Sequence, residues 1–245
     1  MDLDGKVILI TGAARRVGRA IALACASRGS DIALHYRSSA REARETAEEI
    51  RGLGRRVALL RADLADRKAV AALPRRAARA LGRLDGVVAS ASVYRHVPFA
   101  RLNEKAWDLH IEANLTSSYL LAIAAARVMK RGAMVLVGDV MGLRPYRDLL
   151  PYGVSKAGVI HLSQALALAL APRIRVNCLC PGPVLPPERL SPARRRAVAR
   201  ATPLGIGSPE RAAEGVVFLL ENDYATGAVL AVDGGRNIAH VPTKG

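Results

Sequence analysis

Two residues four positions apart, Tyr152 and Lys156, have the types and spacing that proton transfer needs, and Asp139 precedes the tyrosine by thirteen positions. Positions i and i+4 share one face of a helix, so the ammonium of Lys156 is expected beneath the phenol of Tyr152. A nearby cation stabilises phenolate and lowers the pKa of a tyrosine from its usual value of about 10. Such a tyrosine can exchange a proton near neutral pH, as reduction of a C=O or C=N bond by hydride requires.

A second motif, near the amino end, has the composition of a phosphate-binding turn. The run Thr11-Gly-Ala-Ala-Arg-Arg-Val-Gly18 stands between an apolar strand and a helix. Gly12 permits a tight turn and Gly18 lets the helix pack closely on the strand, so that free N–H groups at the helix start face a pyrophosphate. Arg16 stands where the middle glycine of the usual three-glycine pattern would be. The strand before and the helix after this run favour a dinucleotide-binding turn.

The end of the second predicted strand indicates which dinucleotide would bind. An acidic residue at this place would bind the ribose 2′-OH of NAD. The chain has Arg37, Ser38 and Ser39 instead, and a guanidinium with two hydroxyls suits the 2′-phosphate of NADPH. The other interpretation is an ordinary basic turn. Together with the glycine turn, these residues predict a preference for NADPH.

Asp63 and Leu64 follow the third predicted strand, where the adenine ring of a dinucleotide would lie. An aspartate at this place can equally be a simple helix cap. The residues alone leave both interpretations open.

Length and composition indicate one large α/β domain spanning residues 1–245. Apolar residues make up 51% of the chain and aromatic residues only 4%, so small aliphatic side chains must fill the interior. Three cysteines cannot pair evenly, which indicates a reducing, cytoplasmic compartment. Cys178 and Cys180 alternate in an apolar run and are expected to be buried small hydrophobes. No metal site is expected, because no Cys or His pairs have ligand spacing.

Nucleic acid and membranes are not expected as partners. The net charge of +16 could attract nucleic acid or a phosphorylated cofactor. Arginines are scattered along the predicted helices, with one denser cluster at Arg194 to Arg196, and no aromatic residues interleave with them as a stacking platform would need. The amino terminus enters an apolar strand almost at once, and no apolar run reaches about 18 residues, so neither a signal segment nor a membrane span is expected.

Short β-branched runs alternate with Ala-rich amphipathic segments from end to end. The predicted strands are 6–11, 31–36, 56–61, 86–90, 133–138, 174–179 and 228–232. The predicted helices lie near 16–28, 40–53, 66–81, 102–130, 152–171 and 209–221. Strict alternation predicts an α/β fold, a doubly wound Rossmann-type parallel sheet of about seven strands with helices on both faces. The Pro-rich stretch from Pro181 to Pro192 is predicted to be a loop within the domain, part of a substrate loop at about 183–203.

Taken together, these motifs resemble the short-chain dehydrogenase/reductase family over essentially the whole chain. Further matches are Asn114 on the long central helix, Arg175-Val-Asn-Cys-Leu-Cys-Pro-Gly182 after the sixth strand, and Thr226-Gly-Ala-Val-Leu-Ala-Val-Asp-Gly-Gly235 near the end. The resemblance implies an NAD(P)-dependent oxidoreductase that forms a homotetramer.

The resemblance also implies a role for each matching residue. Tyr152 is the acid/base, Lys156 binds the nicotinamide ribose, and Asn114 organises a proton relay. The residues implied to bind the cofactor are Gly12, Arg15, Arg16, Val17, Gly18, His35, Tyr36, Arg37, Ser38, Ser39, Asp63, Leu64, Ser90, Ala91, Ser92, Lys156, Pro181, Gly182 and Val184.

Two departures from the family pattern bear on the substrate. The family has a serine thirteen residues before its tyrosine to hydrogen-bond a substrate carbonyl, and this chain has Asp139. A carboxylate accepts hydrogen bonds and repels a developing oxyanion, so it suits a protonatable heterocycle better than a ketone. The usual Asn-Asn-Ala-Gly after the fourth strand reads Ala89-Ser-Ala-Ser92, which alters the cofactor contact at Ser90.

One branch of the family, the pteridine reductases, is similar to this chain in these features. It shares the form of the turn from Thr11 to Arg19, the His35-Tyr36 pair and the aspartate in place of serine. In that branch the turn arginine and a loop aromatic flank a pterin stacked on the nicotinamide. Arg16 and Tyr94 stand at the matching positions, and Ser92 matches a serine that touches both ligands; a guanidinium can stack on such a ring and donate to it. The other interpretation of Tyr94 is a loop aromatic that covers the edge of the sheet. The implied substrate-binding residues are therefore Arg16, Ser92, Tyr94, Asp139 and Tyr152.

Three hypotheses follow. The first is an NADPH-dependent pteridine reductase that acts on a dihydropterin of the dihydrobiopterin or dihydromonapterin type, or on dihydrofolate. The second is a general carbonyl reductase, such as a 3-oxoacyl-thioester or sugar reductase, in which Asp139 is tolerated. The third is an NADPH-binding regulator without turnover, which the presence of Tyr152, Lys156 and Asn114 together disfavours.

Overall fold

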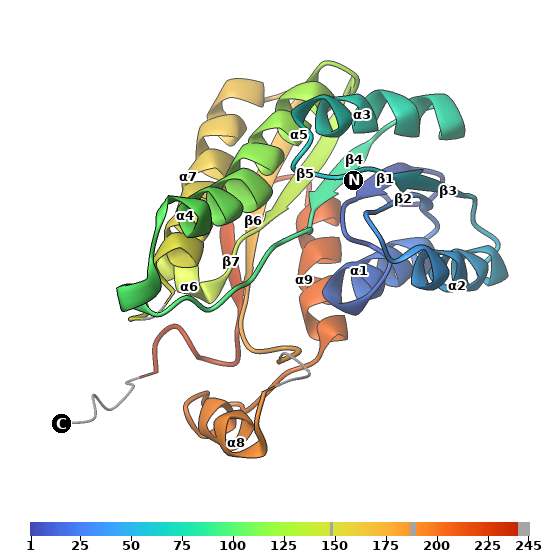
Figure 1. Cartoon of the computed structure of the whole chain (residues 1–245). Coiled ribbons are helices and arrows are strands. Elements are labelled where there is room, and N and C mark those ends of the chain that lie inside the picture. Colours follow the sequence, from blue (N-terminus) through green and yellow to red (C-terminus); the bar gives the residue numbers. More distant parts are fainter. Residues whose placement is uncertain (148, 187–189, 240–245) are drawn as a thin grey trace.

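The computed structural model describes residues 1–147, 149–186 and 190–239, which form a seven-stranded parallel sheet with helices on both faces (Figure 1). The predicted domain also includes residues 240–245, and the predicted substrate loop includes 187–189, both of which lie outside the described residues. The strands are β1 (Val7–Ile10), β2 (Asp31–Tyr36), β3 (Val57–Arg61), β4 (Gly86–Ala89), β5 (Gly132–Val137), β6 (Ile174–Pro181) and β7 (Val229–Val232).

The strand order reverses once, between β1 and β4. Neighbouring strands pair in parallel in the order β3-β2-β1-β4-β5-β6-β7, which confirms the predicted doubly wound fold. The chain runs outward from β1 to β3, returns to pair β4 with β1, and then runs outward on the other side. Ligands of such sheets bind where the order reverses, beyond the carboxyl ends of the strands.

Helices bury the two faces of the sheet in two separate cores. On one face lie α1 (Arg16–Ser27), α2 (Ala40–Gly52) and α9 (Pro209–Glu221), and their core includes Ile21, Ile50 and Val216. On the other lie α3 (Arg67–Leu81), α4 (Glu104–His110), the π-helical turn η2 (Ile111–Thr116), α5 (Ser117–Ala126) and α7 (Leu150–Leu170). The strands between the two cores are nearly continuous apolar runs because both of their faces are covered.

The single long helix predicted at 102–130 is divided in the structure. After the short η1 (Phe99–Arg101), α4 begins at Glu104, and its register changes to π-helical between Ile111 and Thr116 before α5 continues to Ala126. A π-helical turn inside a helix is uncommon and is frequent at functional sites. The far end stops at Ala126 because Arg173 donates hydrogen bonds to the carbonyls of Ala126 and Met129, at 3.0 and 2.7 Å.

Two helices beyond the carboxyl edge of the sheet, α6 (Val140–Leu143) and α8 (Pro192–Arg200), were not predicted. None of the residues of α8 is buried, so no apolar period marks the helix in the sequence. The helix forms because Ser191 caps the amide of Arg194 and Pro192 stands in the first turn. Most of its other residues are alanine and arginine, which have high helix propensity. In Figure 1 this helix lies apart from the sheet, beneath the carboxyl ends of the strands.

By length and composition α7 is also the one helix among the described residues that could cross a membrane, although no apolar run of that length was expected. It packs along β6 and presents Leu168, which is 86% exposed, on its outer face. Its inner face includes Tyr152 and Lys156, both buried.

The side chain of Asn177 joins β6 to the segment that leads into β7, and it generates a stability prediction. Its amide donates to the Ala225 carbonyl at 2.8 Å and accepts from the Ala228 N–H at 3.0 Å, in a fully buried position. Asn177→Leu leaves the Ala228 N–H without a partner, whereas the Ala225 carbonyl still accepts from Arg175, so we expect the free energy of unfolding in urea to fall by roughly 1–3 kcal/mol. Leu168→Ala, at an exposed position, is the control and should change it by less than about 0.5 kcal/mol. Equal effects of the two variants would contradict this role of Asn177.

Candidate active site

The glycine turn between β1 and α1 leaves no room for side chains, as a phosphate cradle requires. A Cβ on Gly18 would lie 2.2 Å from the Gly12 carbonyl oxygen, and one on Gly12 would lie 3.0 Å from the Cα of Ala91. The first turn of α1 contains no acidic residue, and Arg15 makes no side-chain capping bond, so the helix amides are free to bind an anion. These residues fit a dinucleotide pyrophosphate.

Arg16 occupies the middle-glycine position in a left-handed conformation, with a φ of 58°. L-residues other than glycine rarely adopt this region, at a cost of about 1–2 kcal/mol. The guanidinium Nη2 donates to the Leu185 carbonyl at 2.7 Å. The strained backbone therefore aims this arginine across the carboxyl ends of the strands to the loop after β6.

His35 and Thr11 hold the glycine turn from beneath. The Gly12 N–H donates to Nδ1 of His35 at 3.2 Å, and the other ring nitrogen lies 3.2 Å from the Ala62 carbonyl, so Nε2 carries the proton. Burial lowers the pKa of His35 to about 4. Thr11 Oγ1 accepts from the amides of Ser90 and Ala91, both at 3.0 Å. His35 and Thr11 thus position the backbone of the glycine turn.

The end of β2 is basic and exposed, as the sequence indicated. Arg37 and Ser38 are exposed, and Nε of Arg61, the last residue of β3, donates to the Arg37 carbonyl at 3.3 Å. A second guanidinium therefore stands beside the predicted 2′-phosphate position. Asp63 is not a helix cap: it binds the Ala65 amide in a local turn, and Asp66 caps α3.

Asp139 stands at the carboxyl end of β5 with both oxygens engaged. As the N-cap of α6 it accepts from the Met141 amide through Oδ1 at 2.9 Å, and Oδ2 accepts from the Tyr152 hydroxyl at 2.7 Å. Burial raises the pKa of Asp139 above its ordinary value, and the two hydrogen bonds and Lys156 oppose that shift. The sequence interval of thirteen residues thus becomes a direct contact between carboxylate and phenol.

The expected lowering of the Tyr152 pKa is not found. Burial and the Asp139 carboxylate raise the pKa of Tyr152 well above its usual value, while a hydrogen bond with Ser92 opposes them. The Lys156 ammonium lies 5.8 Å from the centre of the Tyr152 ring and donates to the Val137 carbonyl at 2.8 Å. Burial also lowers the pKa of Lys156. In this arrangement the phenol keeps its proton at neutral pH, because burial and the neighbouring carboxylate both disfavour the phenolate.

Asn114 lies in the π-helical turn and joins the loop after β4 to α7. Its Oδ1 accepts from the Val93 amide at 2.8 Å and the Ser92 hydroxyl at 3.2 Å. Its Nδ2 donates to the Val93 carbonyl at 3.1 Å and to Oγ of Ser155 at 3.0 Å. Ser155 Oγ donates in turn to the Tyr152 carbonyl at 2.7 Å. The implied proton relay stays a prediction, but Asn114 links the loop to the tyrosine's helix.

Tyr94 extends from this loop to the tyrosine. The centres of the Tyr94 and Tyr152 rings are 5.0 Å apart in an edge-to-face contact, and Tyr94 is 46% exposed. Burial and Asp139 raise the pKa of Tyr94, and the charge of Arg194 on α8 opposes them. One edge of Tyr94 is thus covered, while much of the ring remains accessible to a ligand.

The turn after β6 closes the far side of the site. Gly182 donates to the Val232 carbonyl at 3.0 Å and accepts from Val184 at 2.8 Å, and a Cβ on Gly182 would lie 2.5 Å from Asp233. This close approach holds the Pro181-Gly182 backbone at the edge of β6 beside β7, where the resemblance places the nicotinamide carboxamide.

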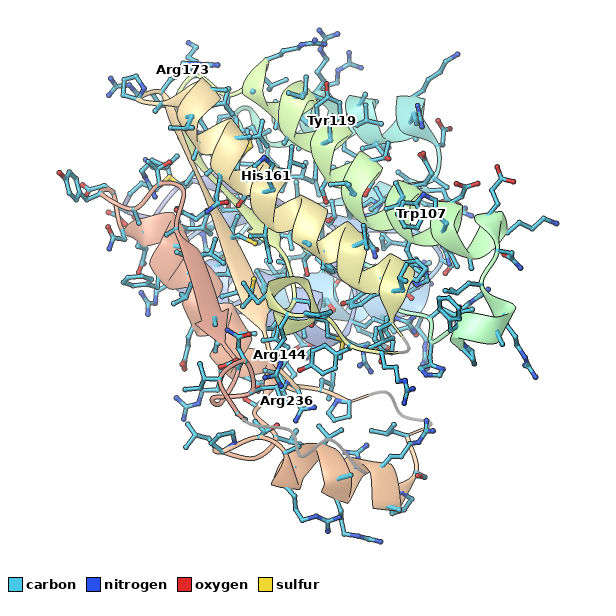
Figure 2. The ribbon with its side chains drawn as sticks, turned by 90° about the vertical axis from the view of Figure 1, so that its left-hand side faces the viewer. Trp107, Tyr119, Arg144, His161, Arg173 and Arg236 are labelled. Atoms are coloured by element: carbon cyan, nitrogen blue, oxygen red, sulfur yellow. The ribbon has the colours of Figure 1, made fainter. Side chains whose placement is uncertain are left out.

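A cluster of cationic and aromatic side chains connects the segment after α6 with the base of α8. The guanidiniums of Arg144 and Arg236 lie 5.5 and 5.7 Å from the ring centre of Tyr146. Arg144 donates to the carbonyls of Asn237 and Ala239, and Arg236 donates to that of Ala201 at the end of α8 (Figure 2). The contact between Arg236 and Ala201 thus joins the end of α8 to the segment that follows β7.

Comparisons with known proteins place this fold and site in a family. A family model described as "Enoyl-(Acyl carrier protein) reductase" matches residues 12–237. An L-rhamnose 1-dehydrogenase (NAD(P)(+)) of Sphingomonas sp. strain SKA58 is 34% identical over 96% of this chain and 98% of its own length. A 3-oxoacyl-[acyl-carrier-protein] reductase of Aggregatibacter actinomycetemcomitans is 35% identical over 94% of this chain and 98% of its own. The chain belongs to the short-chain dehydrogenase/reductase family.

A solved structure of this family supports the same assignment. A short-chain dehydrogenase from Burkholderia cenocepacia J2315, crystallised in complex with NADP, is 33% identical and superposes with a TM-score of 0.92 over 97% of this chain and all of that one. The short-chain dehydrogenase/reductase fold and oxidoreductase class inferred from the sequence are therefore confirmed.

Three residues that position the site were given no role by the sequence prediction: Thr11, Arg61 and Ser155. Ser155 lies three positions after Tyr152, on the same helical face, so its hydroxyl was a recognisable candidate. Arg61 and Thr11 gave no such signal, because their roles depend on neighbours from distant strands.

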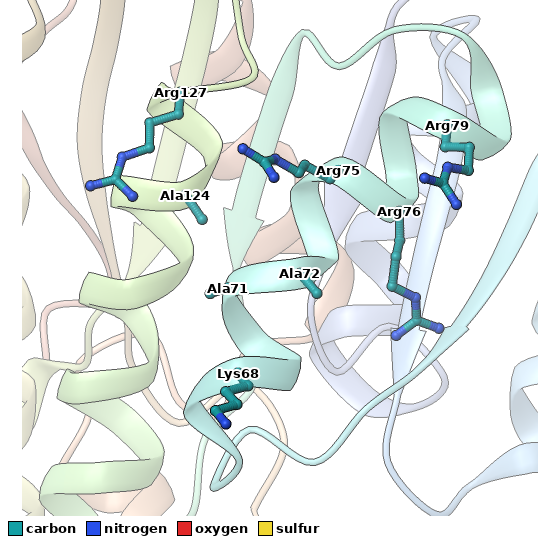
Figure 3. Close-up of a pocket in the computed structure, with 8 residues that line it drawn as sticks. All are labelled: Lys68, Ala71, Ala72, Arg75, Arg76, Arg79, Ala124 and Arg127. Atoms are coloured by element: carbon teal, nitrogen blue, oxygen red, sulfur yellow. The ribbon is translucent and has the colours of Figure 1, made fainter.

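Part of the +16 charge gathers in a groove between α3 and α5 (Figure 3). This hollow has a volume of about 530 Å³. It is lined by Lys68, Ala71, Ala72, Arg75, Arg76, Arg79, Ala124 and Arg127. No aromatic residue is among them, so the groove lacks the stacking surface that single-stranded nucleic acid uses.

The low pKa of His35 predicts an acid-dependent loss of stability. The unfolded chain binds a proton at this histidine below pH of about 6.5, whereas the folded protein resists protonation until about pH 4. The contribution of neutral His35 to the free energy of unfolding is therefore complete above pH 6.5. It falls by about 3 kcal/mol in all as the pH drops from about 6.5 to about 4. We expect urea unfolding at pH 7.5, 6 and 5 to show a steeper loss for the wild type than for His35→Gln. Parallel losses in both proteins would exclude His35 as the cause.

Proposed function

We propose that this oxidoreductase is an NADPH-dependent reductase of a dihydropterin, of the dihydrobiopterin or dihydromonapterin type or dihydrofolate. The observation that supports this proposal is the 2.7 Å hydrogen bond from the Tyr152 hydroxyl to Asp139. The phenol's one proton points at a carboxylate, which a carbonyl reductase of this family would not have.

A carboxylate at this position favours a nitrogen heterocycle over a ketone. A ketone gains negative charge on oxygen as it is reduced, and a carboxylate beside that oxygen disfavours the charge. A pterin instead presents N–H groups that donate to a carboxylate, and each oxygen of Asp139 keeps a lone pair beyond its present hydrogen bond. Asp139 is largely buried but keeps part of its surface exposed, and this part is where a ring edge would approach it.

The chain's own residues would then place a proton on a ring nitrogen. Tyr152 holds its proton at neutral pH, and Asp139 accepts a hydrogen bond from that phenol. Delivery of the phenol proton to nitrogen leaves a phenolate, and a proton taken up from solvent, which Asp139 with its raised pKa can relay, restores the phenol. The paired groups thus supply a proton at the position where the reduced C=N bond requires one.

The ring would lie between Arg16 and Tyr94. Both extend over the carboxyl ends of the strands, and Tyr94 already touches Tyr152. A planar guanidinium can stack on a pterin or donate to it, and an aromatic ring can cover its other side. Ser92, within hydrogen-bonding distance of Asn114, would orient the ring edge.

NADPH, when bound, supplies the hydride. Its pyrophosphate would meet the glycine turn at Gly12 and Gly18, and its 2′-phosphate would meet Arg37, Ser38 and Ser39. Lys156, fully buried beside Tyr152, would bind the nicotinamide ribose.

A second candidate is a general carbonyl reductase, such as a 3-oxoacyl-thioester reductase. The relatives support it: the protein from Aggregatibacter is named for that activity, and none of the relatives named above is described as acting on a pterin. In this case Asp139 would be tolerated rather than required. The comparisons favour this second candidate, whereas the contact between Tyr152 and Asp139 favours the pterin reductase.

We also propose a homotetramer. Exposed apolar side chains on α4, α5 and α7, among them Trp107 and Tyr119, lie on one outer face of the molecule and support burial against another copy (Figure 2). Sedimentation of the purified protein measures the assembly directly.

Asp139→Ser distinguishes the two candidate functions. For a pterin reductase we expect the fold to persist and dihydropterin turnover to fall on the order of 10²-fold, because a positioned proton-transfer group is lost. Ketone reduction should hold steady or rise, since the hydroxyl restores the family's usual carbonyl partner. NADPH oxidation is measured with dihydrobiopterin, dihydromonapterin, dihydrofolate and a 3-oxoacyl thioester in parallel. Robust wild-type turnover of the thioester with none of any dihydropterin would overturn the pterin proposal.

Arg37 predicts a preference for NADPH over NADH. A charge-assisted contact with the 2′-phosphate contributes roughly 1.5–3 kcal/mol, so the ratio of kcat/KM should be about tenfold or more. Arg37→Asp should abolish most of that ratio by raising the KM for NADPH. Arg51→Asp, at the opposite end of α2, is the matched charge control and should leave the ratio unchanged. Equal kcat/KM for the two cofactors in the wild type is the result that excludes this interpretation.

A further inference from the structure

A buried histidine outside the proposed catalytic group lies directly behind the site. His110, the last residue of α4, is fully buried, and its ring centre is 6.1 Å from that of Tyr152 in an edge-to-face contact. Its Nδ1 lies 2.8 Å from the Ala106 carbonyl, and its Nε2 lies 3.3 Å from the Arg95 amide nitrogen. One tautomer satisfies both contacts: Nδ1 donates to the carbonyl, and Nε2 accepts from the amide.

His110 and Asn114 are four positions apart and bind the same loop. Asn114 holds both the N–H and the C=O of Val93, and His110 accepts from the N–H of Arg95. The residue between those two tethered positions is Tyr94. Its backbone is therefore fixed on both sides by one helix, which directs its ring onto Tyr152 at 5.0 Å.

The local helix geometry explains how both side chains reach the loop. The change from α4 to the π-helical turn occurs immediately after His110, between the two residues that bind the loop. Residues four apart share one face of a helix, and the π-helical turn alters the rotation between successive side chains. Both side chains are buried in this loop contact.

We propose that His110 is a positioning residue that fixes Tyr94 as the aromatic wall of the substrate site by accepting the Arg95 amide hydrogen. This inference rests on the proposed function for the role of Tyr94 against a substrate ring, but the tether itself is independent of the substrate. His110 touches neither substrate nor cofactor and acts through the loop. The two tethers hold the backbone of Tyr94, so its half-exposed ring stays against Tyr152 without being buried itself.

The first experiment measures the tether without any substrate. Hydrogen exchange of the 92–96 segment is followed in the wild type, His110→Phe, His110→Gln and His110→Met. Phe keeps the ring shape, and Gln and Met match in length, but only Gln offers an oxygen that can accept from the Arg95 amide. We expect exchange at Arg95 to rise about fivefold or more in Phe and Met and to return toward the wild-type rate in Gln, the effect of losing one neutral hydrogen bond. Asp108→Ala, an exposed change on the same helix, is the control.

The second experiment measures the effect on the site. With the substrate that the wild type turns over, His110→Phe should raise the substrate KM about five- to tenfold and leave kcat and the KM for NADPH within about twofold. In a Tyr94→Ala background the same change should have no further effect, because a tether acting through Tyr94 has nothing left to position. A histidine that only supported the core would instead add its effect to that of Tyr94→Ala.

The outcomes separate the two proposals. Unchanged exchange at Arg95 in both Phe and Met, or KM effects that multiply in the double variant, overturns the role of His110. A wild type that reduces only the 3-oxoacyl thioester overturns the pterin function, while the exchange experiment still decides the tether. Should His110→Phe fail to fold, the Gln and Met pair gives the same comparison.

Discussion

The hydrogen bond between Tyr152 and Asp139 is the interaction on which the arrangement of the site depends. It joins a side chain from α7 to one at the carboxyl end of β5, and it holds the phenol proton against a carboxylate in a largely buried place. Lys156 is near but donates to a backbone carbonyl, so its charge does not dominate the pair. The chemistry of the site is therefore set by which acceptor faces the phenol, and here that acceptor is anionic.

The surrounding structure holds this pair from three sides. Asp139 is fixed by the Met141 amide in α6, and Ser155 connects the Tyr152 backbone to Asn114. Asn114 in turn binds the loop that presents Tyr94 to the same ring. Small movements of the loop after β4 are thereby coupled to the position of the proton donor. The short helix α6 positions Asp139, and the π-helical turn positions Asn114 for its contacts with the loop.

The outer part of the site is held by arginines rather than by an apolar core. Arg16 binds the loop after β6, and Arg236 binds the end of α8 beside the ring of Tyr146. None of the residues of α8 is buried, so its place depends on its two ends.

The sequence by itself determined the seven strands, the doubly wound order of elements, the glycine turn and the family, because these follow from local periodicity and from motifs with fixed spacing. It also identified the aspartate in place of serine, which separates the candidate substrates. Tertiary structure decided the rest. The pKa of Tyr152 rises instead of falling because folding buries the phenol and brings the Asp139 carboxylate into hydrogen-bonding contact with it. The helix α8 and the role of His110 were likewise hidden, since one has no buried face to create a period and the other acts through an amide distant in the chain.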